Sequence, residues 1–246
     1  PTQVQQALLQ TSILDQLTAP LCDSVRDAQD SQAMLERLEH DNLFIVALDD
    51  RRAWYRYHRL FADLLRQRLE RLYPAQLREL HRRAARWYDA QGLASEAIDH
   101  AVAAQELDWA ADMIITAAEP TLARSELATF SRWLELLPEA TICQRPDLCL
   151  YQAWALYWQG YPLDEIEMWL SRLELLSDTQ VGKLAVLRAL IALYRGQMSE
   201  VAAQSRAALA HLAPDDILFR GLVTAFSAFV RLDESDQSEE SGFLID

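Results

Sequence analysis

Lysine is almost absent from this chain, which has a single one, Lys183, among its 246 residues. A phosphate-binding P-loop needs the pattern G-x-x-x-x-G-K-[ST], in which backbone amides surround the phosphates and the lysine reaches them. The segment around Lys183, SDTQVGKL, lacks the first glycine and the final serine or threonine. Patterns such as G-x-S-x-G and H-E-x-x-H are missing too, so we expect no ATPase or other enzymatic activity.

Long apolar runs and a leader-like start are also missing. No run of about 18 apolar residues occurs, and the first ten residues, PTQVQQALLQ, do not combine a basic segment with an apolar core. We therefore expect no membrane span and no signal peptide, and a cytoplasmic location.

Cysteine is scarce, with only Cys22, Cys143 and Cys149, and no CxxC pair. The five histidines are scattered through the sequence. Because a free cysteine usually packs as a small apolar residue, we interpret the three as buried thiols and predict no metal site.

Positive charge is in short supply, and the formal net charge is −14. Residues 1–75 carry nine arginines against eleven acidic residues, and the remainder carries 14 basic against 26 acidic residues. Since a protein that binds DNA must neutralise phosphates, the second part is a poor candidate for DNA binding.

The segment 43–72, LFIVALDDRRAWYRYHRLFADLLRQRLERL, carries the clearest structural pattern. An apolar run rich in β-branched and aromatic residues, a polar turn and a second such run predict a β-hairpin. From Arg59 the period becomes helical, with one apolar face formed by Leu60, Phe61, Leu64, Leu65, Leu69 and Leu72. His58 stands where the second strand gives way to this helix.

Three short helices are predicted ahead of the hairpin, at 4–14, 19–25 and 31–39, the last with an N-cap at Asp30-Ser31. Three helices followed by a hairpin is the order of a winged helix. The third helix, which often enters the DNA major groove, has Arg37 as its only permanent positive charge, beside Glu36 and Glu39. We therefore expect this domain to dock within the protein and not to bind DNA directly.

From Tyr73-Pro74 onward helix follows helix. An alanine precedes a turn glycine by seven residues in ARWYDAQG (85–92), AWALYWQG (153–160) and ALIALYRG (189–196). The last two copies lie 36 residues apart, close to the roughly 34-residue tetratricopeptide period. The sequence predicts a mainly α protein in which the winged helix is followed by a tetratricopeptide-like right-handed α-solenoid.

The segments QTSILDQLTAPLCDSV, LERLEHDNLFIVALDD, WYRYHRLFADLLRQRL and RWLELLP resemble the middle of the MalT-like regulators of the LuxR group, which are STAND ATPases. The resemblance implies a winged-helix domain at 1–73 and an incomplete helical-repeat sensor domain at 74–232. An acidic tail at 233–246 is predicted to be disordered. In the family, an ATPase domain precedes these parts and a DNA-binding helix-turn-helix follows them. ATP or ADP, the two outer domains and an unknown small-molecule or protein effector are therefore the implied partners.

His58 is the candidate cofactor-binding residue. The segment Tyr57-His58-Arg59-Leu60 stands where the related NOD-like receptors carry a Met-His-Asp motif, whose histidine reaches the nucleotide diphosphate. By this resemblance His58 is a nucleotide sensor that acts when the ATPase domain is present, although Arg59 replaces the Asp of the motif. The alternative is a histidine that caps the helix or packs beside Trp54.

Effector binding is assigned to aromatic side chains of the solenoid. Trp154, Tyr157, Trp158, Tyr161 and Trp169 recur at helical spacing, and most such residues form the core between repeats. Trp158 and Tyr161 adjoin the turn at Gly160 and are the pair that we expect to be exposed.

The final repeat is defective, because Leu232 replaces the turn glycine and an acidic, serine-rich run replaces the partner helix. The chain is therefore interpreted either as the relay part of a MalT-like activator or as a free-standing helical-repeat scaffold that competes with such a regulator.

Overall fold

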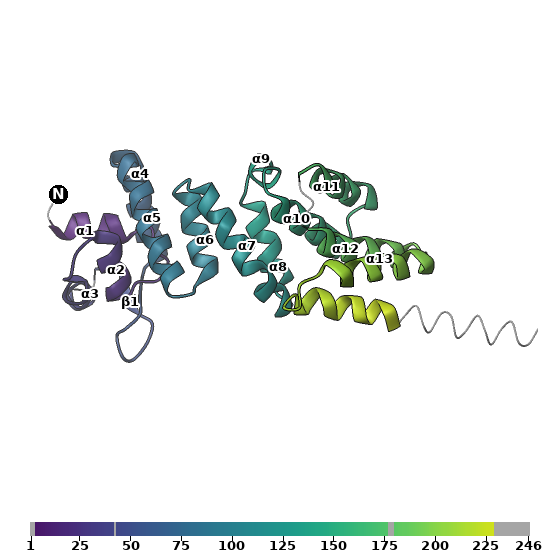
Figure 1. Cartoon of the computed structure of the whole chain (residues 1–246). Helices are drawn as coiled ribbons and strands as arrows, with labels where there is room; N and C mark the ends of the chain where they lie inside the picture. Colours follow the sequence, from purple (N-terminus) through teal and green to yellow (C-terminus); the bar gives the residue numbers. More distant parts are fainter. Residues whose placement is uncertain (1–2, 42, 177–179, 229–246) are drawn as a thin grey trace, which may run out of the picture. The chain divides into compact units, whose positions relative to one another are not determined.

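The computed structural model describes residues 3–41, 43–176 and 180–228. The chain divides into two compact units, one that extends to Ile114 and one that begins at Ile115. Helices make up most of both units (Figure 1). The expected boundary at residue 73, between winged helix and repeats, stays a prediction.

The first unit has the predicted order of a winged helix. Antiparallel pairing joins the two strands, with Ile45 opposite Tyr57 and Ala47 opposite Tyr55. The elements are α1 (Gln3–Thr11), α2 (Ala19–Arg26), α3 (Ser31–His40), β1 (Ile45–Ala47), β2 (Tyr55–Tyr57) and α4 (Arg59–Leu72). The mainly α fold with a small hairpin is thereby confirmed.

A third extended residue joins this hairpin. Leu17, in the connection between α1 and α2, forms an antiparallel bridge with Tyr55. The Leu17 N–H donates to the Tyr55 carbonyl over 2.7 Å, and the Tyr55 N–H donates to the Leu17 carbonyl over 2.9 Å. Strand β2 is therefore paired on both edges, which the sequence did not indicate.

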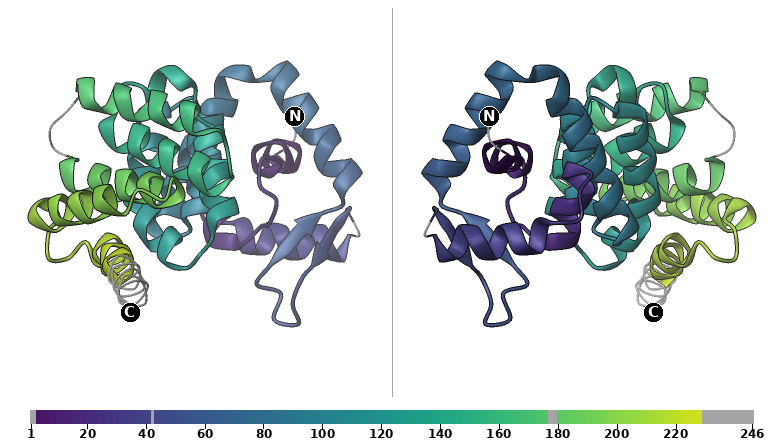
Figure 2. Two further views of the ribbon diagram at one scale, coloured as in Figure 1. Left: turned by 90° about the vertical axis from the view of Figure 1, so that its right-hand side faces the viewer. Right: turned by 90° about the vertical axis from the view of Figure 1, so that its left-hand side faces the viewer.

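The polar turn of the hairpin is built by its first aspartate. Asp49 Oδ1 accepts the backbone N–H groups of Ala53 (2.9 Å) and Trp54 (3.3 Å), as aspartate does in tight turns. Arg52 has a left-handed backbone, with φ of 52°. Figure 2 shows this turn extending away from the three helices.

Apolar side chains, most of them leucines, form the core of the winged helix. The apolar side chains exposed by no more than 1% are Leu14, Leu17, Leu21, Cys22, Val25, Leu35, Leu38, Tyr55 and Leu69. The predicted apolar face of α4 is only partly right, because Leu65 and Leu69 are buried whereas Leu60, Leu64 and Leu72 are exposed. Six apolar positions cover a wider arc of the helix than the core can contact.

Helix α4 ends at Leu72, and α5 (Pro74–Ala90) begins with a proline at its first position. Helix α5 packs against α2 and α6 (Ala94–Ala103), and the Arg83 guanidinium donates to the Val25 carbonyl over 3.3 Å. The first predicted repeat helix thus forms one compact unit with the winged helix. Helix α7 (Leu107–Ala123) follows.

Paired helices build the second unit. Helix α10 packs on α11 and α12 on α13, and residues 217–228 are also helical. The elements are α8 (Leu127–Glu135), α9 (Glu139–Ile142), α10 (Pro146–Trp158), α11 (Leu163–Leu176), α12 (Val181–Tyr194) and α13 (Met198–His211). This pairing is compatible with the predicted solenoid, whose superhelical handedness stays a prediction.

The predicted turn glycines are confirmed, since Gly92, Gly160 and Gly196 have φ between 69° and 76°, a region that glycine enters at little cost. Gly182 has a different role. A Cβ atom there would lie 2.9 Å from the backbone nitrogen of Leu212, so the start of α12 approaches the end of α13 closely. The predicted disordered tail at 233–246, and Leu232, lie outside the described residues.

Two of the three cysteines are buried, as expected. Burial raises the pKa of the Cys22 thiol to about 12 and that of the Cys149 thiol to about 11. Cys143 is only half-buried and accepts a hydrogen bond from Arg172 Nη1 over 3.2 Å. Within the described residues no group of three potential metal ligands occurs, and none of the helices there is both long and apolar enough to cross a membrane.

Candidate functional site

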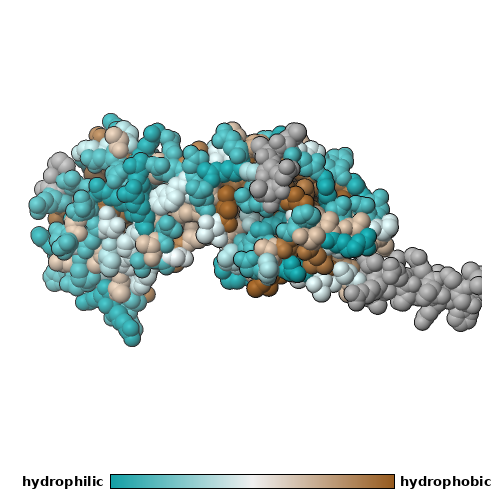
Figure 3. Space-filling view, in the orientation of Figure 1, coloured by the Kyte–Doolittle hydropathy of each residue, from teal (hydrophilic) through white to brown (hydrophobic). Residues whose placement is uncertain are grey.

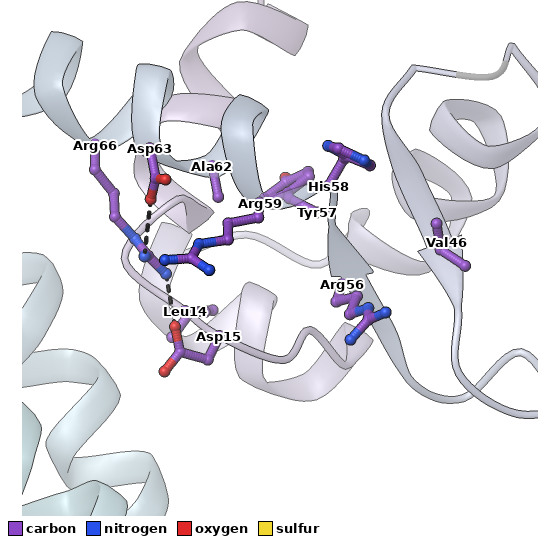
Figure 4. A pocket seen from close by; sticks show the side chains of 10 residues that line it. All are labelled: Leu14, Asp15, Val46, Arg56, Tyr57, His58, Arg59, Ala62, Asp63 and Arg66. Atoms are coloured by element: carbon purple, nitrogen blue, oxygen red, sulfur yellow. Dashed lines mark hydrogen bonds and ion pairs between the residues drawn. The ribbon is translucent and has the colours of Figure 1, made fainter.

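A cavity of about 420 Å³ lies at the junction of the hairpin and α4 in the first unit (Figure 4). Its floor and walls include Leu14, Val46, Tyr57 and Ala62. The charged or titratable side chains that line it are Asp15, Arg56, His58, Arg59, Asp63 and Arg66. The structure therefore brings His58, the predicted sensor, into a pocket with three arginines.

His58 reaches this position because β2 ends at Tyr57 and α4 begins at Arg59. The His58 N–H donates to the Phe44 carbonyl over 2.7 Å, and the His58 carbonyl accepts the N–H of Phe61 and of Ala62. Its side chain is exposed and makes no capping hydrogen bond. His58 is thus the N-cap residue of α4, as the alternative interpretation expected, but it caps the helix through its backbone only, and the sensor role stays a prediction.

The two carboxylates of the pocket are both engaged by Arg66. Arg66 Nη2 lies 2.7 Å from Asp15 Oδ1, and Nη1 lies 3.8 Å from Asp63 Oδ1. Arg66 Nε also donates to the Ser12 carbonyl over 2.7 Å. Arg66 therefore ties α4 to the α1–α2 connection, and its charge is compensated by its own neighbours.

Arg56 and Arg59 have no such compensation. Among the described residues neither forms an ion pair, and both are exposed. Figure 4 shows the Arg59 guanidinium extending toward Arg66 and Asp15, while the His58 ring points away from it. Arg56, His58 and Arg59 thus line the pocket at the N-terminal end of α4 but point in different directions, and the backbone N–H groups of a helix N-terminus also favour an anion.

Sequence reasoning found His58 and missed most of its neighbours. Arg56 could have been found, because it alternates with the buried Tyr55 and Tyr57 and must face outward. Asp15 and Arg66 are 51 residues apart, and nothing in the sequence pairs them.

The second unit contains the predicted effector residues. Trp158 is 47% exposed and Tyr161 is 45% exposed, whereas Trp154 and Trp169 are buried and Tyr157 is half-buried. The predicted exposed pair is thus exposed, although no finding tests its role. The Trp158 ring stacks on Trp154 at 6.4 Å and meets Tyr157 edge-on at 5.6 Å.

A further exposed aromatic side chain, Tyr194, was overlooked. It is 75% exposed and stands 36 residues after Trp158, and each of the two precedes its turn glycine by two residues. Two successive helix pairs therefore present an aromatic ring at the same position of the repeat. On the face seen in Figure 3, hydrophobic side chains gather mainly over the second unit.

The helix order, the hairpin and the bridge at Leu17 define a winged-helix domain. Comparison with known families specifies it further, since residues 1–77 match the MalT winged helix domain. The predicted resemblance to MalT-like regulators is thereby confirmed.

Two relatives extend the similarity beyond this domain. The chain is 35% identical over 210 residues to the HTH-type transcriptional regulator MalT of Klebsiella pneumoniae strain 342, and equally to that of Klebsiella pneumoniae subsp. pneumoniae. The alignments cover 83% of this chain and 23% of each regulator. The chain thus spans about a quarter of the length of these transcriptional regulators.

Proposed function

We propose that the chain is the winged-helix and sensor portion of a MalT-like, ATP-dependent transcription activator, and that it relays a signal from its helical repeats to a nucleotide switch. The observation that carries this proposal is the pocket that holds His58 with the uncompensated Arg56 and Arg59. The similarity of the chain to transcriptional regulators supports it.

The residues of the pocket suit a phosphate group. A guanidinium donates paired hydrogen bonds to phosphate oxygens, and an imidazole can donate one more. The chain has no P-loop, and Lys183 contacts Glu119 and Asp216 in the second unit. The pocket would therefore touch the phosphates of a nucleotide that another domain, the ATPase domain of the family, holds.

His58→Ala in a longer regulator that contains this chain tests the relay. We expect inducer-independent activity to rise, because the resting state loses a phosphate contact, and a promoter-fusion assay measures it. His40→Ala is the matched control, since His40 is exposed on α3 and does not line the pocket. Unchanged basal activity in His58→Ala would contradict the proposed sensor.

For the second unit we propose that Trp158 and Tyr161 bind the effector, with Tyr194 beside them. The half-buried Tyr157 meets Trp158 edge-on at 5.6 Å, and Tyr194 occupies the position equivalent to Trp158 in the next helix pair. Trp158→Ala should raise the effector concentration needed for half-maximal response about tenfold, since stacking on an aromatic ring contributes roughly 1–3 kcal/mol. Met168→Ala, also at an exposed apolar side chain of the unit, is the control.

A different class of function, a helical-repeat scaffold that competes with a full-length regulator, is the alternative. It is favoured by the exposed aromatic side chains of the repeats, which suit a protein surface as well as a small ligand. A pull-down separates the two functions. A stable complex between the isolated chain and a full-length relative supports the scaffold, and its absence supports the relay.

We further propose that this part of the regulator makes no direct DNA contact and acts in the cytoplasm, where the chromosome lies. On α3, Arg37 lies 3.7 Å from Asp41, and Glu39 holds Arg52 of the hairpin at 3.3 Å. The charges of Arg37 and Arg52 are thereby compensated by acidic neighbours. DNA binding would fall to the helix-turn-helix domain of the family.

A further inference from the structure

Helix α4 has a second surface, which is apolar, whereas the pocket is lined mainly by charged or titratable side chains. Leu60 is 75% exposed, Leu64 60% and Leu72 49%. They lie on the flank of α4 that faces away from Asp63 and Arg66 at 3.6 residues per turn. Large exposed apolar side chains that adjoin one another mark a contact surface for a partner.

This flank borders a groove between α1 and α4 of about 350 Å³. Helix α1 contributes Leu8 and Leu9, and α4 contributes Phe61, Leu64 and Leu72. The apolar surface continues onto the wing, because the rings of Phe44 and Phe61 stack at 5.0 Å and Phe44 is 60% exposed. An apolar groove of this kind is a surface into which an amphipathic helix can lay its apolar face.

The charge along this groove is positive. Arg68 and Arg71 follow Leu64 by four and seven residues, so they share its face of the helix. Both are exposed, and neither forms an ion pair with any described residue. Because the chain as a whole carries a net charge of −14, two uncompensated arginines beside an apolar groove indicate an acidic partner.

We propose that the groove between α1 and α4 binds an amphipathic helix that combines leucine-like side chains on its contact face with glutamate or aspartate along its edges. The apolar side chains of that helix fill the space beside Leu8, Leu64 and Leu72. Its carboxylates pair with Arg68 and Arg71. A second copy of the same surface fits poorly, since a twofold contact would bring these arginines near their own counterparts.

Two synthetic helical peptides of equal length test this proposal. Both carry the same leucine pattern, and one has glutamate and the other lysine at the flanking positions. Fluorescence anisotropy with the chain should show at least tenfold tighter binding of the glutamate peptide. Leu64→Glu should weaken that binding at least tenfold, whereas Leu209→Glu, at an exposed leucine of the second unit, should leave it unchanged.

Reversing the charge of the two arginines gives a second test of the proposal, which does not depend on the leucines. The double variant Arg68→Glu/Arg71→Glu alters exposed side chains only and should prefer the lysine peptide. Equal binding of both peptides, or binding of neither, overturns the proposal. A concentration-dependent dimer of the chain that Leu64→Glu abolishes in sedimentation overturns it too, and assigns the surface to a second copy.

Discussion

The two units of the chain differ in whether their arginines form ion pairs with acidic side chains. In the second unit, Arg172 pairs with Glu139, Arg188 with Glu174, and Arg195 with Glu167. In the first unit, Arg66 pairs with Asp15 and Arg82 with Glu106, but Arg56, Arg59, Arg68 and Arg71 form no ion pair with any described residue. The difference separates charges that join helices from charges that are available to a ligand or partner.

Lys183, the single lysine, is the clearest example of a charge that joins helices. Lys183 on α12 lies between Glu119 of α7 and Asp216, which is 3.5 Å away. Its ammonium also lies 5.1 Å from the centroid of the Phe219 ring, and the Tyr151 hydroxyl donates to Glu119 over 3.4 Å. The lysine that would bind phosphate in a P-loop protein here connects helices of the second unit.

The largest effect is expected from Lys183→Met. The side chains of Lys183 and Asp216 are each only 17% exposed, so the change leaves two partly buried carboxylates facing each other. We expect the free energy of unfolding to fall by about 2–3 kcal/mol, as measured by denaturant titration. Arg59→Met removes an uncompensated charge and should stay within about 0.5 kcal/mol. Equal losses in the two variants would remove the distinction between the units.

Gly182→Ala should come next. The added Cβ would lie 2.9 Å from the Leu212 nitrogen, and relieving that contact costs about 1–3 kcal/mol. Gly221→Ala is the control, because it lies in the helix 217–228 with nothing within 4 Å. It should stabilise the protein by about 0.5–1 kcal/mol, since alanine restricts the unfolded chain. A stable Gly182→Ala protein would show that α12 and α13 can separate freely.

A histidine pair makes the first unit sensitive to acid. The Nδ1 atoms of His81 and His100 lie 2.8 Å apart, and Tyr88 stacks on His100. Burial, and then the charge of Arg66, lower the pKa of His81 to about 4, and burial, followed by His81, lowers that of His100 to about 4.

The sign of the effect follows from these values. Between pH 6.5 and pH 4 the unfolded chain binds protons that the folded chain does not. Each histidine should therefore lower the free energy of unfolding by up to about 1.4 kcal/mol per pH unit as the pH decreases through this range, with no change above it. His100→Gln should flatten the dependence, measured by thermal melts at several pH values, and His211→Gln, at an exposed histidine, should not. An equal slope in His100→Gln would rule out the pair as its source.

The smallest effect concerns the pocket. Arg66→Gln removes contacts to Ser12 and Asp15, and because its side chain is 34% exposed we expect a loss of no more than about 1 kcal/mol. Chemical denaturation of Arg66→Gln beside Arg56→Gln measures it. If Arg56→Gln destabilised the protein equally, Arg56 would have a structural role and would not be free for an anion.

Local patterns in the sequence predicted most of the fold. The hairpin, the start of α4 at Arg59 and the turns at Gly92, Gly160 and Gly196 depend on neighbouring residues, and all are confirmed. Contacts between distant residues were not predictable, such as Leu17 with Tyr55 or Asp15 with Arg66. Of the candidate site, His58 came from a resemblance, and its arginine neighbours became visible only in the fold.

The bridge between Leu17 and Tyr55 makes the wing a mechanical part of the helical domain. Two short strands alone are marginally stable in water, and here the inner strand is held by a segment 38 residues earlier in the chain. A displacement of the hairpin therefore also displaces the connection between α1 and α2. The same connection contains Asp15 and the Ser12 carbonyl, both of which contact Arg66. Any displacement of the wing must stretch or break the contacts that position the neighbouring pocket.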